Sequence, residues 1–272
     1  MPVEIDKERL PRHIAVIMDG NGRWAAKRRL GRVRGHRQGI QAVKATVKAC
    51  RELKIPYLTI FAFSTENWGR PKDEIQGLMG LLRQYIKSEL KEIRDNGVRI
   101  KVMGDISGLP ADVLEQIDDA IAQTAHNKDM VLSIALSYSG RWDILDAAKQ
   151  LARKAAKGEI DPEQITEQMF ADHLASHPEP DPDLLIRTSG EERISNFLLW
   201  QLAYTEIYVT PTLWPDFDKD ELHKAIAAYQ QRERRMGLTA EQLARQQGQD
   251  QNREQADEPR DPADDTHGSM GT

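Results

Sequence analysis

The feature that most constrains this chain is the alternation of short apolar runs with longer segments of helical periodicity. Six runs predict β-strands, at residues 13–18, 57–63, 98–104, 131–137, 183–188 and 206–210. The segments between them predict helices over residues 37–54, 72–95, 110–126, 141–157 and 162–175. Several strands are apolar almost throughout, as in sheets that are covered on both faces. This order of elements predicts an α/β fold in which helices flank a six-stranded, mainly parallel sheet.

The organisation of the chain is that of one domain followed by a polar tail. No linker or internal repeat interrupts residues 1–237. Residues 238–272 are rich in Gln and Asp and contain few large apolar side chains. Such a segment buries too little apolar surface to offset the conformational entropy that is lost on ordering. We therefore expect a single domain over 1–237 and a disordered tail over 238–272.

Composition argues against several classes of protein. The net charge of −5 disfavours a general nucleic-acid binder. The single cysteine, Cys50, rules out an intramolecular disulfide and a cysteine zinc cluster. No apolar run approaches the ~20 residues of a transmembrane helix, and the N-terminus lacks the apolar core of a signal peptide. These features predict a cytoplasmic protein without a transmembrane segment.

Polar side chains follow four of the predicted strands. Ligands of open α/β sheets bind beyond the carboxyl ends of the strands, so these residues are expected to meet at one edge. They are Asp19, Asn21 and Arg23 after the first strand, Ser64, Glu66, Asn67, Trp68 and Arg70 after the second, Ser137, Tyr138, Gly140 and Arg141 after the fourth, and Arg187, Thr188, Ser189 and Gly190 after the fifth.

A basic segment follows the first strand, with seven Lys or Arg residues and no acid between Arg23 and Arg37. A solvated basic face is the usual meaning of such a run. Here the run begins at a glycine turn that opens a helix, where backbone N–H groups favour an anion, and arginine suits bidentate phosphate contacts. The glycines also fit a loose dinucleotide motif or a hairpin turn, but poorly. Nucleic acid is disfavoured by the overall negative charge.

A second group of cations, at residues 186–195, would suit a second diphosphate: Arg187 and Arg193, with the hydroxyl of Ser195. Two anion sites with one carboxylate, Asp19, between them meet the needs of an enzyme that condenses two diphosphate esters. A bare carboxylate would repel phosphate, whereas a divalent cation can bridge it to phosphate oxygens. The sequence therefore predicts a diphosphate site that is assisted by a divalent metal ion.

Several blocks of residues 11–237 resemble the cis-prenyltransferases: HIAVIMDGNGRWA, GH at 35–36, FAFSTENWGRP, GRWD at 140–143, and the stretch from DLLIRTSGEERISNF to TPTLWPDF. The resemblance implies a homodimer with an elongated hydrophobic tunnel in a single catalytic domain. It implies repeated cis additions of isopentenyl diphosphate to an allylic diphosphate, usually farnesyl diphosphate, with Mg2+. The implied product is a long polyprenyl diphosphate near C55, undecaprenyl diphosphate, a lipid carrier for cell-wall peptidoglycan synthesis. A short- or medium-chain cis synthase remains the alternative.

The resemblance also assigns roles by position. It implies catalytic roles for Asp19 and Asn67 and metal binding by Asp19 and Glu206. It implies that Arg235, Met236 and Gly237 reach the partner's site. The implied substrate-binding residues are Gly20, Asn21, Gly22, Arg23, Trp24, Arg32, His36, Ser64, Thr65, Glu66, Trp68, Arg70, Arg187, Arg193 and Ser195.

Three further expectations follow. The product would be delivered to the membrane, with the enzyme cytoplasmic or peripheral at the inner face. The apolar stretch NFLLWQLAYTEIYVTP exceeds what one helix and one edge strand easily hide, which favours a dimer. The tunnel would be lined by Ala62, Leu81, Leu82, Tyr85, Ile86, Val102 and Leu132.

Two other protein classes fit less well. The unrelated trans-prenyltransferases use paired DDxxD motifs, and Asp118-Asp119 lacks the third aspartate. A non-catalytic subunit of a hetero-complex would usually lack part of the first motif, whereas Asp19, Arg23, Asn67 and Trp68 are all present.

Overall fold

The computed structural model describes residues 3–232, and these residues belong to one compact unit. The expectations for Arg235, Met236, Gly237 and the tail over 238–272 lie outside this range. The strands are β1 (His13–Ile17), β2 (Tyr57–Ser64), β3 (Val98–Met103), β4 (Met130–Tyr138), β5 (Leu184–Thr188) and β6 (Glu206–Thr210). The helices are α1 (Asn21–Lys27), α2 (Arg32–Glu52), α3 (Lys72–Asp95), α4 (Ala111–Thr124), α5 (Gly140–Ala156), α6 (Glu167–Ala171) and α7 (Lys219–Gln230).

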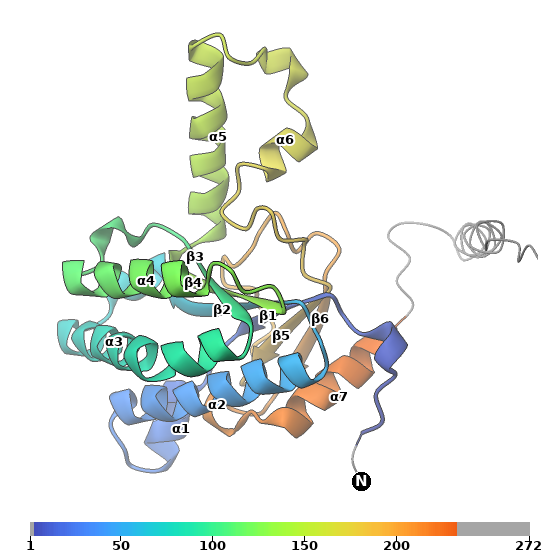
Figure 1. The fold of residues 1–272 in the computed structure, drawn as a ribbon. Coiled ribbons are helices and arrows are strands. Elements are labelled where there is room, and N and C mark those ends of the chain that lie inside the picture. Colours follow the sequence, from blue (N-terminus) through green and yellow to red (C-terminus); the bar gives the residue numbers. More distant parts are fainter. Residues whose placement is uncertain (1–2, 233–272) are drawn as a thin grey trace, which may run out of the picture. The chain divides into compact units, whose positions relative to one another are not determined.

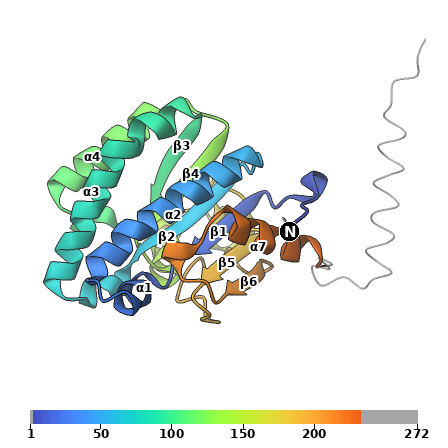
Figure 2. The ribbon, with the colours of Figure 1, turned by 90° about the horizontal axis from the view of Figure 1, so that it is seen from below.

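The six strands form one sheet in the order β3-β4-β2-β1-β5-β6 (Figures 1 and 2). All five pairings are parallel, which confirms the predicted fold class. The central strands are apolar because both of their faces are covered, and every residue of β1 and β5 is buried. The described helices include none that is both long and apolar enough to cross a membrane.

The two faces of the sheet are covered differently. A continuous layer of α4, α3, α2 and α7 packs on one face over the larger core cluster, and each helix contacts the next (Figure 2). The other face carries a smaller cluster that includes Phe197, Leu198 and Tyr138, and Trp142 of α5 packs against it. Helix α5 then extends away from the sheet, and α6 lies beside it (Figure 1).

The helix predictions need correction in three places. Helix α7 was not predicted, and α2 begins at Arg32 rather than at residue 37. Helix α1 follows the glycine turn that was expected to open a helix, and it has seven residues and buries only Ala25. The helix predicted over 162–175 is wrong, since a 3-10 turn at Pro162–Gln164 ends at an extended Ile165 and the five-residue α6 follows.

The apolar stretch that follows Asn196 also differs from expectation, because residues 197–204 form turns rather than a helix. Phe197 and Leu198 are fully buried in the smaller cluster, whereas the side chains of Tyr204 and Ile207 are 70% and 43% exposed. Strand β6 is an edge of the sheet. Part of the stretch is therefore core, and the remainder is exposed along an edge strand.

Two glycines of α2 let the start of α1 approach closely. A Cβ atom at Gly35 would lie 2.1 Å from the backbone oxygen of Asn21. A Cβ atom at Gly39 would lie 2.3 Å from Oδ1 of the same residue. Any larger side chain at either position would push α1 away from α2 and move the residues that follow β1.

A buried histidine couples the stability of the sheet to pH. His13 Nδ1 lies 2.6 Å from the carbonyl oxygen of Pro180, and Nε2 lies 2.8 Å from Thr59 Oγ1. Burial lowers the pKa of His13 from its ordinary value of 6.5 to about 4. The unfolded chain therefore binds a proton at higher pH than the folded chain, and stability falls as the pH drops from 6.5 to 4.

We predict that His13→Gln flattens this acid-side loss of stability. The full effect of one such histidine is roughly 3 kcal/mol at pH 4 relative to pH 7. The free energy of unfolding, measured in urea at several pH values between 7 and 4, should fall less steeply in the variant than in the wild type. His126→Gln, which removes an exposed histidine, is the control. Identical slopes for His13→Gln and wild type would contradict the prediction.

Candidate active site

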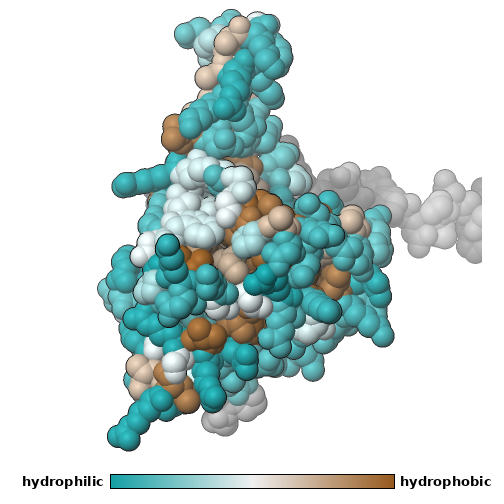
Figure 3. All heavy atoms as spheres, turned by 90° about the vertical axis from the view of Figure 1, so that its left-hand side faces the viewer, coloured by the Kyte–Doolittle hydropathy of each residue, from teal (hydrophilic) through white to brown (hydrophobic). Residues whose placement is uncertain are grey.

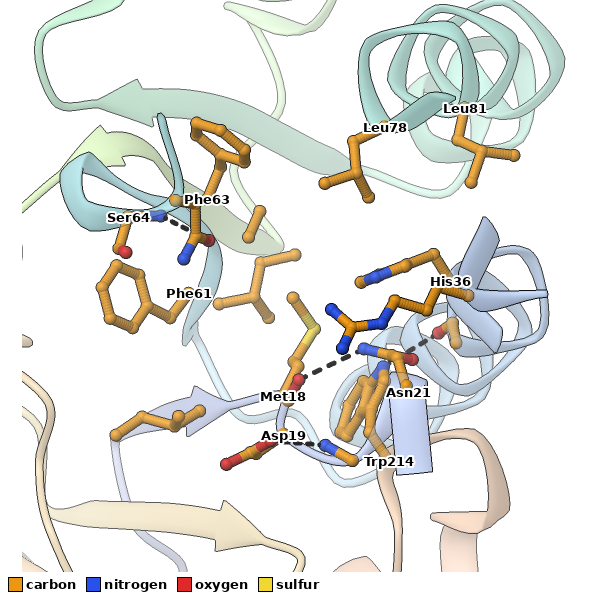
Figure 4. Close-up of a pocket in the computed structure, with 18 of the residues that line it drawn as sticks. Met18, Asp19, Asn21, His36, Phe61, Phe63, Ser64, Leu78, Leu81 and Trp214 are labelled. Carbon is orange, nitrogen blue, oxygen red and sulfur yellow. Dashed lines mark hydrogen bonds between the residues drawn. The ribbon is translucent and has the colours of Figure 1, made fainter. Parts of the chain in front are cut away.

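A large cavity opens at the carboxyl edge of the sheet and runs between the sheet and helices α2 and α3 (Figure 4). Its volume is about 1070 Å3, at the upper end of small-molecule sites. The interior is apolar and is lined by Ile40, Val43, Ile60, Ala62, Leu78, Met79, Leu81, Leu82, Tyr85, Ile134 and Leu136. The mouth is polar and carries Asp19, Asn21, Arg23, Arg32, His36, Ser64, Glu66, Asn67, Arg70, Glu74, Arg187, Arg193, Ser195 and Asn196.

This cavity largely follows the predicted tunnel lining. Ala62, Leu81, Leu82 and Tyr85 line it, as expected. The predicted residues Ile86 and Val102 instead line a small, wholly apolar cavity of about 20 Å3. That cavity shares Leu82, Tyr85, Ile134 and Leu136 with the large one and therefore continues its deep end. Leu132 lines neither cavity, and its side chain is fully buried in the core.

Asp19 is held at the mouth by its main chain. Its N–H donates to Thr188 Oγ1 at 2.9 Å, and its carbonyl accepts from that hydroxyl at 2.7 Å. The carboxylate accepts from the Gly20 N–H at 2.7 Å and from Arg187 Nη2 at 3.0 Å. Asp19 does not cap α1, whose N-cap is Gly20 and has no capping side chain. The carboxylate is therefore held at the cavity mouth by Arg187 and is not used as a helix cap.

The structure also brings together the residues of the second predicted anion site, Arg187, Arg193 and Ser195. Arg187 is 3% exposed, and its Nη1 donates to Ser195 Oγ at 2.7 Å and to the backbone oxygen of Arg193. The Nε atom of Arg187 is buried and has no hydrogen-bond partner in the described part of the chain. A buried guanidinium with an unused donor, beside a hydroxyl and a second arginine, can donate to a phosphate oxygen.

The first predicted anion site contains Glu74, a residue that the sequence did not single out. Arg32 Nη1 lies 3.2 Å and Arg70 Nη1 3.1 Å from the carboxylate of Glu74, and His36 Nε2 lies 3.9 Å from it. Burial and the neighbouring charge of Arg70 lower the pKa of His36 from 6.5 to about 4, so this imidazole is neutral at pH 7. The available signal for Glu74 was its position four residues after Arg70, in the first turn of a predicted helix.

The loop that follows β2 is organised by Asn67. Its Oδ1 accepts from the Ser64 N–H at 3.2 Å, and both residues take part in a capping box (Figure 4). Glu66 Oε1 accepts from Asn196 Nδ2 at 2.8 Å, which ties the loop to the segment after β5. Asn196 is a second residue at the mouth that sequence reasoning missed, because only the fold brings it to Glu66.

Four of the predicted site residues do not line the cavity. Trp24 donates to Asp216 Oδ1 at 2.7 Å, outside the cavity. Trp68 donates to Ser137 Oγ at 3.0 Å and packs on Phe63. The cavity lining also lacks Thr65 and Glu206.

Glu206 lies at the opposite edge of the sheet. In the register of the sheet, Glu206 pairs with Leu184, and Leu184 pairs with Ile14. Ile14 lies five residues before Asp19 in the sequence. That offset places it about 16 Å from Asp19 along the strand direction. The carboxylate of Glu206 accepts from Arg232 Nη1 at 2.7 Å. One chain therefore does not bring together the two residues predicted to bind metal.

The group after β4 also departs from the prediction, since Ser137, Tyr138, Gly140 and Arg141 do not line the cavity. Tyr138 donates to the buried carboxylate of Asp143 at 2.9 Å. Gly140 packs against Leu199, where a Cβ atom would lie 2.6 Å from Cγ. These residues join β4 to α5 and support the smaller core cluster.

The donor set at the mouth fits a magnesium ion that is shared with a phosphate ligand. In residues 3–232, no three His, Cys, Asp or Glu side chains gather closely enough to hold a metal ion by themselves. Mg2+ commonly binds one or two carboxylates and completes its shell with water and substrate phosphate. Asp19, 32% exposed at its side chain and next to two anion groups, is the carboxylate placed for this role.

Comparison with known proteins is consistent with this site. The model of a protein family described as "Putative undecaprenyl diphosphate synthase" matches residues 17–237. An isoprenyl transferase of Heliobacterium mobile is 52% identical over 86% of this chain and 90% of its own length. One of Chromobacterium violaceum is 53% identical over the same shares of the two chains.

Two solved structures share the fold. Lavandulyl diphosphate synthase from Lavandula x intermedia, in complex with dimethylallyl diphosphate, has a TM-score of 0.81 and 38% identity, over 84% of this chain and 98% of its own. A probable undecaprenyl diphosphate synthase from Campylobacter jejuni has a TM-score of 0.70 and 35% identity, over the same shares.

We predict that Asp19→Asn reduces turnover by about 100- to 1000-fold, as for loss of a preorganised charged group. The amide can still accept from Arg187, so the thermal midpoint should move little. Asp19→Ala should lose activity equally and also lose stability, because it leaves the buried guanidinium of Arg187 without a hydrogen-bond acceptor at this position. Initial rates and thermal midpoints, each measured across a magnesium titration, test both statements.

The matched control for this test is Asp216→Asn. Asp216 pairs with Arg28 and Trp24 near α1, outside the cavity. Its loss should change the rate by less than about threefold, as for an exposed ion pair. A near-normal rate for Asp19→Asn, with the magnesium dependence of wild type, would show that the carboxylate has no part in the reaction.

Proposed function

Because this chain belongs to the undecaprenyl diphosphate synthase family of prenyltransferases, we propose that it condenses isopentenyl diphosphate onto an allylic diphosphate. The allylic substrate is farnesyl diphosphate, and the additions are repeated and cis. The observation that carries this proposal is one cavity with an arginine-rich mouth and a long apolar interior. The mouth suits diphosphates, and the interior suits the hydrocarbon chain that grows from them.

The allylic diphosphate lies against Arg23, Arg32, His36 and Arg70. Arg32 and Arg70 have side chains that are 69% and 35% exposed, so their donors can reach a ligand. The neutral imidazole of His36 can donate one hydrogen bond without adding charge. When the diphosphate leaves, an allylic cation is generated. A cluster of fixed guanidinium groups stabilises the negative charge that develops on the leaving group.

Isopentenyl diphosphate lies against Arg187, Arg193 and Ser195. The network from Arg187 to Ser195 and Asp19 fixes the direction of the guanidinium group before the ligand arrives. The two diphosphates are then held on either side of Asp19, with their hydrocarbon ends toward the cavity. Holding both reactants in this way converts a bimolecular step into an effectively unimolecular one.

Asp19 would hold the Mg2+ ion, which would supply charge neutralisation for the leaving group. Asn67 orders the loop after β2 through the Ser64 N–H, and its amide lines the cavity next to the reacting centre. Glu206 can contribute to a metal site only from a second chain, because it lies at the other edge of its own sheet. In that arrangement the metal would draw on both subunits.

The product is a long polyprenyl diphosphate, near C55. Burial of hydrocarbon in the apolar interior stabilises the growing chain by roughly 0.8 kcal/mol per CH2. Ala62 contributes only a methyl group to the wall, which leaves room along β2. The product serves as the lipid carrier of cell-wall peptidoglycan synthesis. It passes from a cytoplasmic enzyme, peripheral at the inner face, to the membrane.

The active form is a homodimer. Exposed apolar side chains follow the smaller core cluster along the edge strand β6, including Tyr204 and Ile207. An edge strand with exposed apolar residues favours association with a second chain. By contrast, the face that carries α1 shows only small apolar patches among hydrophilic residues (Figure 3).

Chain length is tested with farnesyl diphosphate and radiolabelled isopentenyl diphosphate, with products resolved by chromatography. We expect products near C55 for wild type and shorter products for Ala62→Leu, which narrows the cavity. Ala122→Leu, at an exposed position of α4, is the control. Wild-type products that stop at C15 to C20 with saturating isopentenyl diphosphate would instead support the short-chain alternative.

Association is tested by sedimentation at nanomolar protein concentration. We expect a dimer for wild type and for Asp19→Asn. Tyr204→Glu combined with Ile207→Glu should shift the protein toward monomer with a matching loss of activity, because two carboxylates would be buried in the interface. A fully active wild-type monomer would end the dimer proposal.

A further inference from the structure

Glu74 is a buried carboxylate in the wall of the cavity mouth, in the first turn of α3. The residue is only 6% exposed. Its two oxygens face two cations, Arg32 at the start of α2 and Arg70 just before α3. The neutral imidazole of His36, one turn after Arg32, lies 3.9 Å away. Carboxylates are rarely buried unless they are paired, and these cations account for its burial.

The position of Glu74 conflicts with that of a bound diphosphate. The same three side chains face the cavity and would hold the allylic diphosphate. Among residues 3–232, no three His, Cys, Asp or Glu side chains gather closely enough to hold a metal ion by themselves, so Glu74 belongs to no such ligand cluster. A diphosphate at Arg32 and Arg70 would therefore lie beside an uncompensated negative charge.

We propose that Glu74 is the internal counter-anion of the allylic diphosphate site. Without ligand, Glu74 takes Nη1 of both Arg32 and Arg70. A diphosphate binds by taking these guanidinium groups over. The inference rests on the proposed function, in which these residues bind the allylic diphosphate.

This exchange lowers the affinity of the site for every diphosphate. The site can bind a diphosphate only while Arg32 and Arg70 are released from Glu74. If that state is populated for only a fraction of the time, the apparent affinity is reduced by the same fraction. The lower affinity allows a diphosphate to leave once the reaction is complete. Glu74 thus lowers the affinity of the cavity mouth for diphosphates without distinguishing one diphosphate from another. It does not touch the reacting carbons.

The competing role for Glu74 is that of a positioning residue. In that role its carboxylate holds Arg32 and Arg70 in the orientation that a diphosphate needs, and its removal weakens binding. The two roles predict changes of opposite sign in diphosphate affinity. Affinity for inorganic pyrophosphate therefore separates them without any dependence on turnover.

The experiment is isothermal titration calorimetry of the full chain with inorganic pyrophosphate, at fixed magnesium concentration. Glu74→Gln keeps the shape of the side chain and removes its charge, and Glu74→Ala is measured alongside in case the amide disturbs folding. We expect both to bind pyrophosphate about tenfold more tightly than wild type, as for the loss of one charge-assisted competitor. Thermal midpoints verify that each variant is folded.

The matched control is Asp73→Asn. Asp73 precedes Glu74 in the same first turn of α3, but its side chain is exposed and does not line the cavity. It therefore reports the effect of removing one negative charge from this helix end. Its affinity for pyrophosphate should change by less than about threefold.

Arg32→Ala separates failure of the inference from failure of the proposed site. If wild type binds pyrophosphate and Arg32→Ala binds it more weakly, the allylic site stands. Weaker or unchanged binding by both Glu74 variants would then overturn the counter-anion role alone. If wild type fails to bind, or Arg32→Ala binds as tightly as wild type, the proposed anion site is itself wrong and the inference falls with it.

Discussion

The pairing of β1 with β5 is the constraint on which the candidate active site depends. Its register sets Ile17 level with Arg187, and Thr188 then makes hydrogen bonds to both the N–H and the carbonyl of Asp19. The Trp214 N–H donates to the same carbonyl at 3.0 Å. As a result, Asp19 meets Arg187 at 3.0 Å across 168 residues of sequence. A one-residue slip would send the side chains to opposite faces and dismantle the centre of the site.

Electrostatic compensation makes so dense a cluster of arginines tolerable. Each of the five arginines at the cavity mouth contacts Asp19, Glu74 or Glu191. Binding of a diphosphate is therefore an exchange of partners, and its free energy is a difference between two sets of charge-assisted contacts. The affinity of the mouth depends on its internal carboxylates as well as on its cations.

The uneven cover of the sheet explains where the hydrocarbon chain can go. On one face, turns and the start of α5 pack directly on the strands around Phe197. On the other face, the cavity separates α2 and α3 from part of the sheet, next to Ile60 and Ile134. Because the cavity begins at the carboxyl edge and ends among apolar side chains, one space serves both the charged and the apolar ends of a prenyl diphosphate.

The sequence by itself determined the sheet and the types of residue at its ligand edge. Buried strands leave uninterrupted apolar runs, and the carboxyl ends of parallel strands meet, so Asp19, Ser64 and Arg187 could be placed at one edge before the fold was known. Helix α7 left no comparable signal, since tertiary packing rather than local pattern stabilises it.

Tertiary structure alone decided which side chains face the cavity. Trp24 and Arg23 are neighbours in one helix, yet the ring pairs with Asp216 outside the cavity while the guanidinium lines it. Glu74 and Asn196 became part of the mouth only through contacts with distant elements. A linear sequence fixes the order and chemistry of side chains, but the rotation of a helix against its neighbours fixes the direction in which each one points.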